Sequence, residues 1–377
     1  MRTAEFDYNL PPELIAQTPI EPRDSSRLMV VDRRTGKIAH RHFHDLPNFL
    51  RAGDLLVHNE SRVIPARLFA RKPSGGKVEL LLLRQRTDST WETLVKGRNV
   101  RTGLRLAILD GPDGQPVGAE AEVTEVGERG ACVLSFDRPA LSLAEQVGVT
   151  PLPPYIHTPL ENAERYQTVY ARTPGSAAAP TAGLHFTPAL LLRLREMGVR
   201  SAFVTLHIGL DTFRPVSEEY IHGHHMHTEY GSLTPEVAEQ VNQAKLEGQR
   251  VVAVGTTSVR MLETAAVEAQ IANRKSQITN HKSASQQISK SPCAIRHAPC
   301  ADSPFVQPFE GATDLFIYPG YEFRVVDALI TNFHLPRSTL LMLVAAFAGK
   351  ALLERAYAEA IRERYRFYSF GDAMLIV

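Results

Sequence analysis

The segment ARLFARKPSGGKVELLLLRQRTDSTWETLV, residues 66–95, carries three apolar runs of strand length separated by short turn signals. The runs are Ala66–Ala70, Val78–Leu83 and Trp91–Val95, and the turn PSGG separates the first two. Short strands and turns without a helical period are typical of an all-β domain. The segment therefore predicts a small barrel or sandwich.

Three further runs continue the pattern: Leu104–Leu109, Ala121–Val126 and Ala131–Phe136. The turn signals GPDG and GERG separate them, and a helical period first returns at Ser142–Val147. We therefore expect residues 62–148 to form an inserted all-β domain resembling a small barrel.

On both sides of this insert the chain alternates between apolar strands and amphipathic helices. Leu28–Asp32 and Asp54–His58 have the short, apolar composition of buried strands. After Pro151 the pattern predicts helices at residues 187–197, 235–247, 259–267, 340–348 and 352–365, and strands at residues 202–207, 250–254, 325–331 and 372–377. The simplest architecture is an α/β main domain, residues 1–61 plus 149–377, interrupted by the β insert.

Residues 271–304 differ from the rest of the α/β domain because they are poor in aromatics and rich in Ser, Gln, Asn and Lys. Such a segment cannot bury enough apolar surface to offset the entropy lost when its backbone is ordered. We expect a disordered surface loop. Cys293, His297 and Cys300 suggest a metal site there, but the segment offers no evident fourth ligand.

Composition narrows the class of protein. The 377 residues suffice for two domains, and 42 basic against 41 acidic side chains mean that a nucleic-acid binder must concentrate its charge locally. Three scattered cysteines do not form a disulfide framework. The N-terminal segment lacks the apolar run of a signal peptide, and Leu340–Phe347 is far shorter than the roughly 20 residues that span a bilayer. We expect a cytoplasmic protein without membrane contact.

Charge is unevenly distributed along the β insert. Arg62–Arg105 contains eleven Lys or Arg and three acids, whereas Leu106–Gln146 contains two basic and eight acidic residues. The basic strands are candidates for binding an anionic nucleic-acid backbone, although separation along the sequence is not separation on the surface.

Two segments place small or hydroxyl-bearing residues at the start of a predicted helix. In VVAVGTTSVRMLET, residues 251–264, a strand, a glycine and three hydroxyl residues can seat a carboxylate or phosphate on free amides. This is neither a Walker A loop nor a GxGxxG fingerprint, and a plain helix N-cap is the alternative. In AAAPTAGLHFT, residues 177–187, a ligand can approach closely and His185 can act as acid or base; a tight turn with a core histidine is the alternative.

The segment HGHHMHTE, residues 222–229, suggests a zinc site, because on a strand His225, His227 and Glu229 share one face. Hydrogen bonding or base stacking is the favoured role. Other polar residues stand beside apolar elements in EPRDSSR, NESRVIPAR, YPGY, TNFHLPRS and YSFGD. NESRVIPAR lies where the α/β domain passes into the β insert, and clefts commonly form at such junctions.

Eight segments of the chain resemble, in order, the S-adenosylmethionine:tRNA ribosyltransferase-isomerase family of queuosine biosynthesis. They include FDYNLPPELIAQTPIEPRDSSRL, NESRVIPARL, APTAGLHFT, HIGLDTFRPV, HHMHTEY, VGTTSVRMLET and YRFYSFGDAMLIV. Each is weak alone, but eight in order are highly specific, and they cover nearly the whole chain outside the β insert and residues 271–304.

The resemblance implies a particular reaction. The 7-aminomethyl-7-deazaguanine base at the wobble position of a tRNA with a GUN anticodon attacks the ribosyl carbon of S-adenosylmethionine. Adenine and methionine leave, and the sugar rearranges to give epoxyqueuosine-tRNA. S-adenosylmethionine is a co-substrate, and no metal or other cofactor is implied.

This chemistry leads to hypotheses about the site residues. Catalytic roles are assigned to His185, His207, His227, Glu229 and Asp372. The methionine or ribose end of the donor is assigned to Thr256, Thr257, Ser258 and Arg260. The tRNA phosphates or the target base are assigned to Arg23, Arg27, Arg62 and Arg67. The shape of the donor or base pocket is assigned to Asn332, His334 and again Asp372.

Two other classes of function remain as alternatives. The first is a non-catalytic RNA-binding protein built around the basic strands, although binding alone does not require the clustered His, Arg and Asp of the α/β domain. The second is a zinc hydrolase that uses the histidine-rich segment, which metal analysis of protein purified without a His tag would test.

Overall fold

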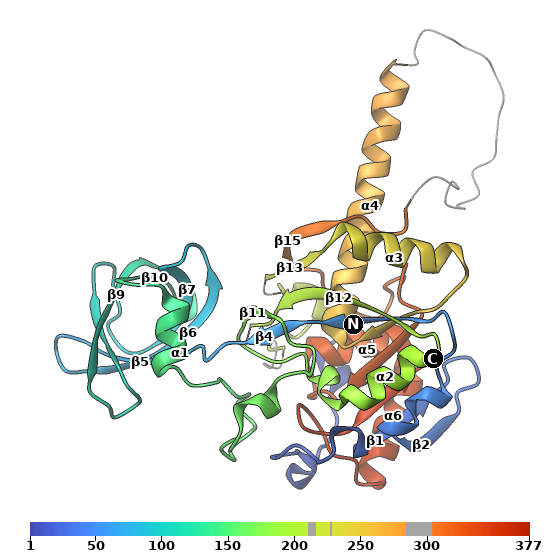
Figure 1. Ribbon diagram of the computed structural model, residues 1–377, viewed down its shortest axis with the longest axis horizontal. Coiled ribbons are helices and arrows are strands. Elements are labelled where there is room, and N and C mark those ends of the chain that lie inside the picture. The colour runs from blue at the N-terminus through green and yellow to red at the C-terminus, as the bar shows by residue number, and fades with distance from the viewer. Residues whose placement is uncertain (210–215, 227, 284–303) are drawn as a thin grey trace.

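The computed structural model describes residues 1–209, 216–226, 228–283 and 304–377. It contains an α/β body and a closed β-barrel that stands apart from the body and is joined to it by two passages of chain (Figure 1). The expected fold class, an α/β domain with an inserted barrel, is thereby confirmed.

The body is built on one nine-stranded sheet. Its strands lie in the order β15 (Phe309–Thr313), β13 (Glu229–Leu233), β12 (Arg200–His207), β3 (Leu55–Asn59), β14 (Val251–Val254), β16 (Ala328–Asn332), β17 (Ala373–Ile376), β1 (Arg27–Val31) and β2 (Ile38–His42). The four strands β12, β3, β14 and β16 are mutually parallel, so their carboxyl ends meet at one edge of the sheet. In α/β sheets, ligands bind outside this edge.

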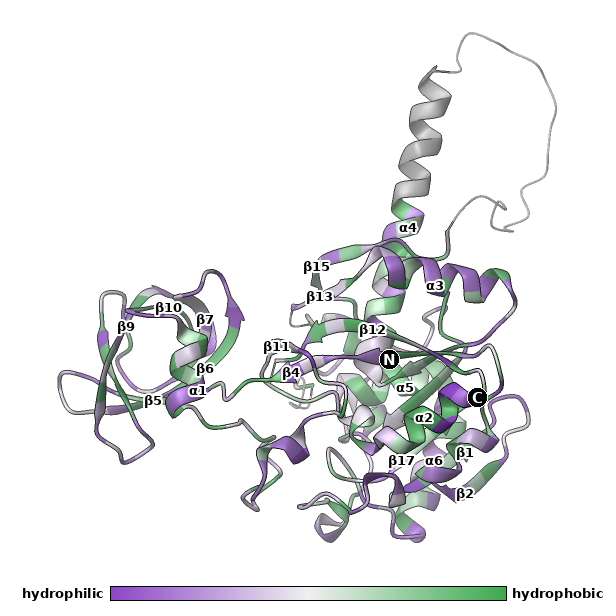
Figure 2. Cartoon of the chain, in the orientation of Figure 1, coloured by the Kyte–Doolittle hydropathy of each residue, from purple (hydrophilic) through white to green (hydrophobic). Residues whose placement is uncertain are grey.

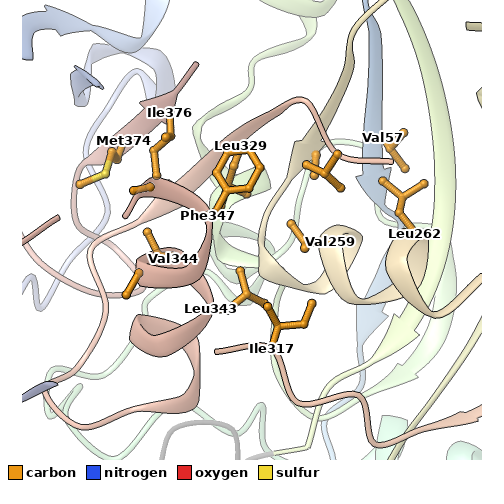
Figure 3. Packing of buried hydrophobic residues seen from close by; sticks show 14 of the residues in the cluster. Val57, Val259, Leu262, Ile317, Leu329, Leu343, Val344, Phe347, Met374 and Ile376 are labelled. Atoms are coloured by element: carbon orange, nitrogen blue, oxygen red, sulfur yellow. The ribbon is translucent and has the colours of Figure 1, made fainter. Parts of the chain in front are cut away.

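Both faces of the sheet are buried, because successive side chains enter two different cores. Val57 and Leu329 belong to one core and Leu56 and Ile330 to the other. The first core contains residues of α3 (Pro235–Leu246), α4 (Thr256–Ser283), α5 (Thr339–Ala348) and α6 (Lys350–Arg362), and part of it is shown in Figure 3. The second contains residues of α2 (Pro188–Glu196) and the 3-10 helix Phe43–Asn48. Two-sided burial explains the continuous apolar runs of the central strands.

The barrel is closed by six antiparallel strands. They are β5 (Arg67–Arg71), β6 (Lys77–Gln85), β7 (Thr90–Lys96), β8 (Arg105–Leu109), β9 (Pro116–Val126) and β10 (Ala131–Phe136). Leu80, Trp91 and Leu134 fill the interior, and residues of α1 (Ala140–Val147) join the same core. Closure leaves no free sheet edge, which a strand-rich domain of this size must otherwise protect.

The chain enters and leaves the barrel side by side. Arg67 and Val149 exchange two backbone hydrogen bonds, of 3.1 and 2.9 Å. Just beyond them, β4 (Ser61–Val63) pairs in parallel with β11 (Thr173–Ser176). Short 3-10 helices complete the described chain at Thr3–Phe6, Pro12–Leu14, Arg23–Ser25, Glu128–Gly130, Ala163–Tyr166, Thr181–His185 and Ile221–Gly223.

Helix α4 corrects one expectation. It continues to Ser283 and projects from the body (Figure 1), so residues 271–283 are helical rather than part of a disordered loop. Residues 256–283 contain neither glycine nor proline, and a helix needs only its own backbone hydrogen bonds where nothing interrupts them. Residues 284–303, with Cys293, His297 and Cys300, lie outside the described residues.

No helix in the described part of the chain is long and apolar enough to cross a membrane. The apolar helix α5 is buried in the core, whereas α3 and α6 each have an apolar and a polar face (Figure 2).

Candidate functional site

A pocket opens at the carboxyl edge of the parallel strands. Residues at or just after the ends of three of these strands line it. Ile208 follows β12, Gly255 follows β14, and Asn332 ends β16. The segment 179–182, the start of α5 and the residues Tyr368 and Ser369 complete the lining. We refer to this site as the donor pocket.

The N-terminus of α4 forms one wall of the donor pocket. Gly255 adopts φ +90°, a left-handed conformation that favours glycine, and turns the chain from β14 into α4. Thr256 and Thr257 line the pocket, and the Thr257 Oγ1 is buried without a hydrogen-bond partner among the described residues. The Ser258 hydroxyl instead donates to the Val254 carbonyl at 2.9 Å. Of the three hydroxyl residues that the motif assigns to the donor, Thr256 and Thr257 thus lie at the pocket and Ser258 does not.

Asn332 connects the donor pocket to His185. Its Nδ2 donates to the Tyr368 carbonyl and to the His185 Nε2, both at 3.2 Å, while its Oδ1 accepts from the Thr181 hydroxyl at 2.9 Å. Because a carbonyl can only accept, the Tyr368 carbonyl fixes which end of the amide faces His185. Tyr368 holds this carbonyl in place with a left-handed φ of +70°.

The orientation of Asn332 also determines the tautomer of His185. The Nε2 accepts from the amide, so Nδ1 carries the proton and donates to the Ser26 hydroxyl at 2.7 Å. Burial, together with the charges of Arg366 and Arg23, lowers the pKa of His185 to about 3. His185 is therefore a neutral residue with both ring nitrogens occupied, which suits it for positioning Asn332.

His334 lines the donor pocket directly. Its Nε2 lies 2.7 Å from the Thr331 hydroxyl, and its backbone is held between two tyrosines: Tyr8 donates to its carbonyl, and its amide donates to the Tyr357 hydroxyl at 2.8 Å. Burial lowers the pKa of His334 to about 3. The ring thus faces the pocket as a fixed, neutral imidazole.

Arg260 and Glu229 lie away from the pocket and pair with each other. The Arg260 Nη1 contacts the Glu229 carboxylate, its Nη2 donates to the Thr313 carbonyl at 3.2 Å, and both side chains are almost fully buried. Glu229 also accepts from the Gly209 amide at 3.4 Å. This pair connects α4 to β13 and β15, so in this structure both residues support the position of α4 and do not line the pocket.

Among the described residues, no other histidine lines the donor pocket. His207 ends β12, and its ring lies so close to Gly175 that a Cβ there would come within 2.9 Å of its Cε1. Burial lowers its pKa. His227 lies outside the described residues. The side chain of His224 contacts Glu218 at 2.9 Å, so part of the histidine-rich segment is engaged in an ordinary ion-pair geometry.

Within the described residues, His42, His44 and Asp45 have ligand atoms close enough together to hold a metal ion; they form a partly exposed group where β2 passes into the 3-10 helix Phe43–Asn48. It lies outside the segment that suggested zinc. Residues 222–226, 228 and 229 contribute no such group, and His227 lies outside the described residues.

The four arginines assigned to tRNA have different partners. Arg23 donates to three backbone carbonyls, and Arg27 donates to the Glu363 carbonyl at 2.7 Å and stacks on Tyr365. Arg62 pairs with Glu164, and Arg67 pairs with Glu79 at 3.1 Å. The structure thus brings Arg23 near His185 and engages Arg62 and Arg67 in ion pairs.

Asp372 holds the backbone rather than facing the donor pocket. Its carboxylate accepts from the amides of Arg27 and Arg366, at 2.9 and 2.8 Å. Burial raises its pKa, which these hydrogen bonds oppose. The carboxylate fixes the turn that precedes β17, and this turn carries Tyr368 and Ser369 to the pocket.

Sequence reasoning missed several residues that the fold brings to the site. Thr181 and Tyr368 complete the Asn332 network, Ser369 and Tyr155 line the pocket, and the Tyr155 hydroxyl lies 2.8 Å from the Ser369 Oγ. Thr181 lies in the motif AAAPTAGLHFT and Tyr368 in YSFGD, so both residues stand in segments that the sequence singles out. Their partners, however, lie 36 to 151 residues away.

Comparison with known proteins identifies relatives that match the whole chain. The family model described as "Queuosine biosynthesis protein" matches residues 3–376. The chain belongs to this family. Curated members from Symbiobacterium thermophilum and Thermus thermophilus, both named S-adenosylmethionine:tRNA ribosyltransferase-isomerase, are 52% and 53% identical to it. The first alignment covers all of both chains, and the second covers 99% of this chain and 98% of the relative.

A solved structure supports the same assignment for the family's fold. The crystal structure of the S-adenosylmethionine tRNA ribosyltransferase from Thermotoga maritima is 40% identical in sequence, with a TM-score of 0.52. The alignment covers 99% of this chain and 100% of that one. The resemblance expected from the eight motifs is confirmed.

Proposed function

We propose that the donor pocket binds S-adenosylmethionine and that this protein transfers and isomerises its ribosyl group onto 7-aminomethyl-7-deazaguanine at the tRNA wobble position. Adenine and methionine are released, and the product is epoxyqueuosine-tRNA. The observation that carries the proposal is the buried Thr257 hydroxyl, which has no described protein partner and lies in the pocket at the N-terminus of a long helix.

The α4 N-terminus suits the methionine carboxylate of the donor. The first amides of a helix have no intrahelical partner, and the helix dipole adds a partial positive charge there. The Thr257 hydroxyl offers a further donor at the same place. A buried hydroxyl left unpaired costs about 1–3 kcal/mol, a cost that a bound carboxylate would remove.

The opposite side of the donor pocket suits the sulfonium and the reacting sugar. The rings of Tyr155 and Tyr368 lie with centroids 4.7 Å apart, and aromatic faces attract cations. Asn332 and His334 offer an amide and a neutral imidazole without adding positive charge beside the sulfonium. In this proposal His334 contacts the donor, whereas His185 acts through Asn332 as a positioning residue.

Isotope labelling tests the reaction. Donor labelled in the ribose should deliver its label to tRNA, whereas a methyl label should leave with free methionine. Adenine and methionine should appear in equal amounts, and only with tRNA that carries the aminomethyl-deazaguanine base. Methyl label on tRNA, or S-adenosylhomocysteine as product, would contradict the proposal.

A binding measurement tests the carrying observation separately. Thr257→Val should weaken the affinity for S-adenosylmethionine by about ten-fold, the loss of roughly one hydrogen bond to a charged group. Thr264→Val is the matched control, because Thr264 lies in the same helix and its hydroxyl is 2.8 Å from that of Thr313. If the two variants bound S-adenosylmethionine with equal affinity, the donor would not bind at the α4 N-terminus.

We extend the proposal to three finer points: the tRNA substrates carry a GUN anticodon, the reaction needs no metal or organic cofactor, and the protein works in the cytoplasm. Turnover of matched tRNAs that differ in the first anticodon letters tests the first point. Full activity after dialysis against a chelator, with metal analysis of the untagged protein, tests the second. Fractionation of the source cells tests the third.

A further inference from the structure

A second, smaller pocket adjoins the donor pocket. We call it the arginine pocket, because Arg23 and Arg165 line it together with His185 and the segment Ser369–Gly371. Ser369 lines both pockets, so they meet at this residue. Arg366 lies beside it: its guanidinium donates to the carbonyl of Thr18, the residue before Pro19 in the pocket lining.

The positive charge of this pocket is only partly compensated. The Arg23 guanidinium donates to the carbonyls of Gln167, Glu164 and Leu184, at 2.7, 3.1 and 3.4 Å. The Arg366 guanidinium likewise donates to a backbone carbonyl. Carbonyls hold a guanidinium in place without cancelling its net charge, so both arginines keep their capacity to attract an anion.

The acids nearby do not remove this charge. Glu21 pairs with Arg165 from an exposed position, and Glu164 pairs with Arg62. Asp372 is buried, and its carboxylate already accepts from two backbone amides. Arg23 is half-buried, and it feels the repulsion of Arg165 as well as the weaker attraction of Glu21 and Glu164. Two like charges are thus held close together beside the donor pocket.

We propose that the arginine pocket binds a backbone phosphate of tRNA next to the target nucleotide, so that the target base enters where the two pockets meet at Ser369. This inference rests on the proposed function. Guanidinium groups match phosphate oxygens in pairs, and proteins that read single-stranded RNA combine such contacts with aromatic surfaces. Phe370 supplies an aromatic ring in the same lining.

Arg366→Gln and Arg165→Gln test the proposal in the full-length protein, with Arg355→Gln as the matched control. Arg355 is exposed, does not line either pocket, and donates to the carbonyl of Gly36, the same type of contact that Arg366 makes. Binding of an unmodified tRNA transcript is measured over a range of salt concentrations. Binding of S-adenosylmethionine is measured without RNA.

Each pocket variant should weaken tRNA binding about three- to ten-fold and lower the slope of log affinity against log salt by about 0.7, the value for one phosphate on a single strand. The affinity for S-adenosylmethionine and the control should be unchanged. Wild-type tRNA affinity and slope in both variants would overturn the inference. Loss of donor affinity with normal tRNA binding would overturn it too, because the arginines would then serve the donor carboxylate.

The two failures are distinguishable, since a wild-type protein that does not bind S-adenosylmethionine contradicts the proposed function and not the phosphate site. Melting temperatures accompany each variant. Arg165 has an ion pair to lose, so if Arg165→Gln does not fold, Arg366→Gln decides the question. Arg23→Lys adds a second measure: it keeps the charge but loses the paired hydrogen bonds, and it should show reduced affinity with a nearly normal salt slope.

Discussion

The ion-paired arginines of the barrel and Arg23 of the arginine pocket occupy different electrostatic environments. In the barrel, carboxylates of neighbouring strands lie beside the guanidinium groups: Arg67 with Glu79 at 3.1 Å, and Arg84 with Glu92 at 3.0 Å. In the body, Arg23 is held by backbone carbonyls, which carry no net charge. The count of basic residues along a strand therefore does not measure the charge that an anion would meet.

Antiparallel pairing explains this difference. The acidic part of the insert contains β9, which pairs with β8 and β10, and this pairing places Glu122 of β9 opposite Arg105 of β8. Arg86 contacts Glu125 at 2.9 Å, and Lys77 contacts Asp113. Some charges that lie apart along the sequence are thus paired on the barrel surface, and these paired residues are weaker candidates for tRNA docking than the sequence suggests. Arg71 and Lys72, in contrast, donate to backbone carbonyls.

The largest expected difference between the two regions concerns ion-pair energetics. Arg260→Met removes the guanidinium that pairs with the buried Glu229 carboxylate and should lower the free energy of unfolding by about 3–5 kcal/mol. Arg260→Met/Glu229→Gln should recover part of this loss, because no charge is then stranded. Urea unfolding followed by circular dichroism measures both, and a loss below about 1 kcal/mol would make this pair equivalent to those of the barrel.

The second largest effect is expected in the hydrogen-bond network of Asn332. Asn332→Ala removes the group that joins Thr181, His185 and Tyr368, and we expect about a 100-fold loss of turnover, as when reacting groups are misplaced by about 1 Å. Single-turnover kinetics at saturating donor measure it. His185→Asn, which can keep one hydrogen bond to Asn332, should retain more activity than His185→Ala. Equal loss in the two would argue against a positioning role.

Acid should destabilise the body more than the barrel. Burial lowers the pKa of His58, His185 and His334 to about 3, and residues 62–148 contain no histidine. A histidine with a lowered folded-state pKa gives stability that is complete above its unfolded value, near 6.5, and is lost as pH falls from there toward 3. Each such residue should cost about 1.4 kcal/mol per pH unit below about 6.

Two spectroscopic signals report the two regions. Trp91, the one tryptophan of the chain, is buried in the barrel, whereas most helical dichroism comes from the body. Between pH 7 and pH 5 the dichroism midpoint in urea should fall while the Trp91 fluorescence midpoint stays nearly constant. His58→Phe should reduce the pH dependence of the dichroism midpoint. A parallel fall of both signals would show that body and barrel unfold as one unit.

The smallest effects are expected in the barrel. Arg67→Gln and Arg84→Gln remove partly exposed ion pairs, which contribute about 0.2–1 kcal/mol each. We expect little change in stability, and a change in the salt slope of tRNA binding well below that of Arg366→Gln. If each barrel substitution lowered the salt slope of tRNA binding by about 0.7, the barrel would be the docking surface for tRNA.

Much of the fold followed from the sequence. The strand runs of the insert, the apolar central strands and most helices depend on local periodicity, and local periodicity is written in consecutive residues. The end of α4 was missed, because low hydrophobicity was read as disorder although a helix without Gly or Pro can continue on backbone hydrogen bonds alone. The strand order of the sheet was not predicted, since it depends on contacts between distant segments.

For the site, the sequence indicated candidate motifs and the family to which the chain belongs. Thr256, Thr257, Asn332 and His334 were identified in this way and do line the donor pocket. Only the tertiary structure decided which side chains contact each other: Arg260 pairs with Glu229, Arg67 with Glu79, and His185 with Asn332. The physical reason is that a polar side chain acts through its partners. Partners 12 to 147 residues away are brought together by sheet order and packing, which no local pattern encodes.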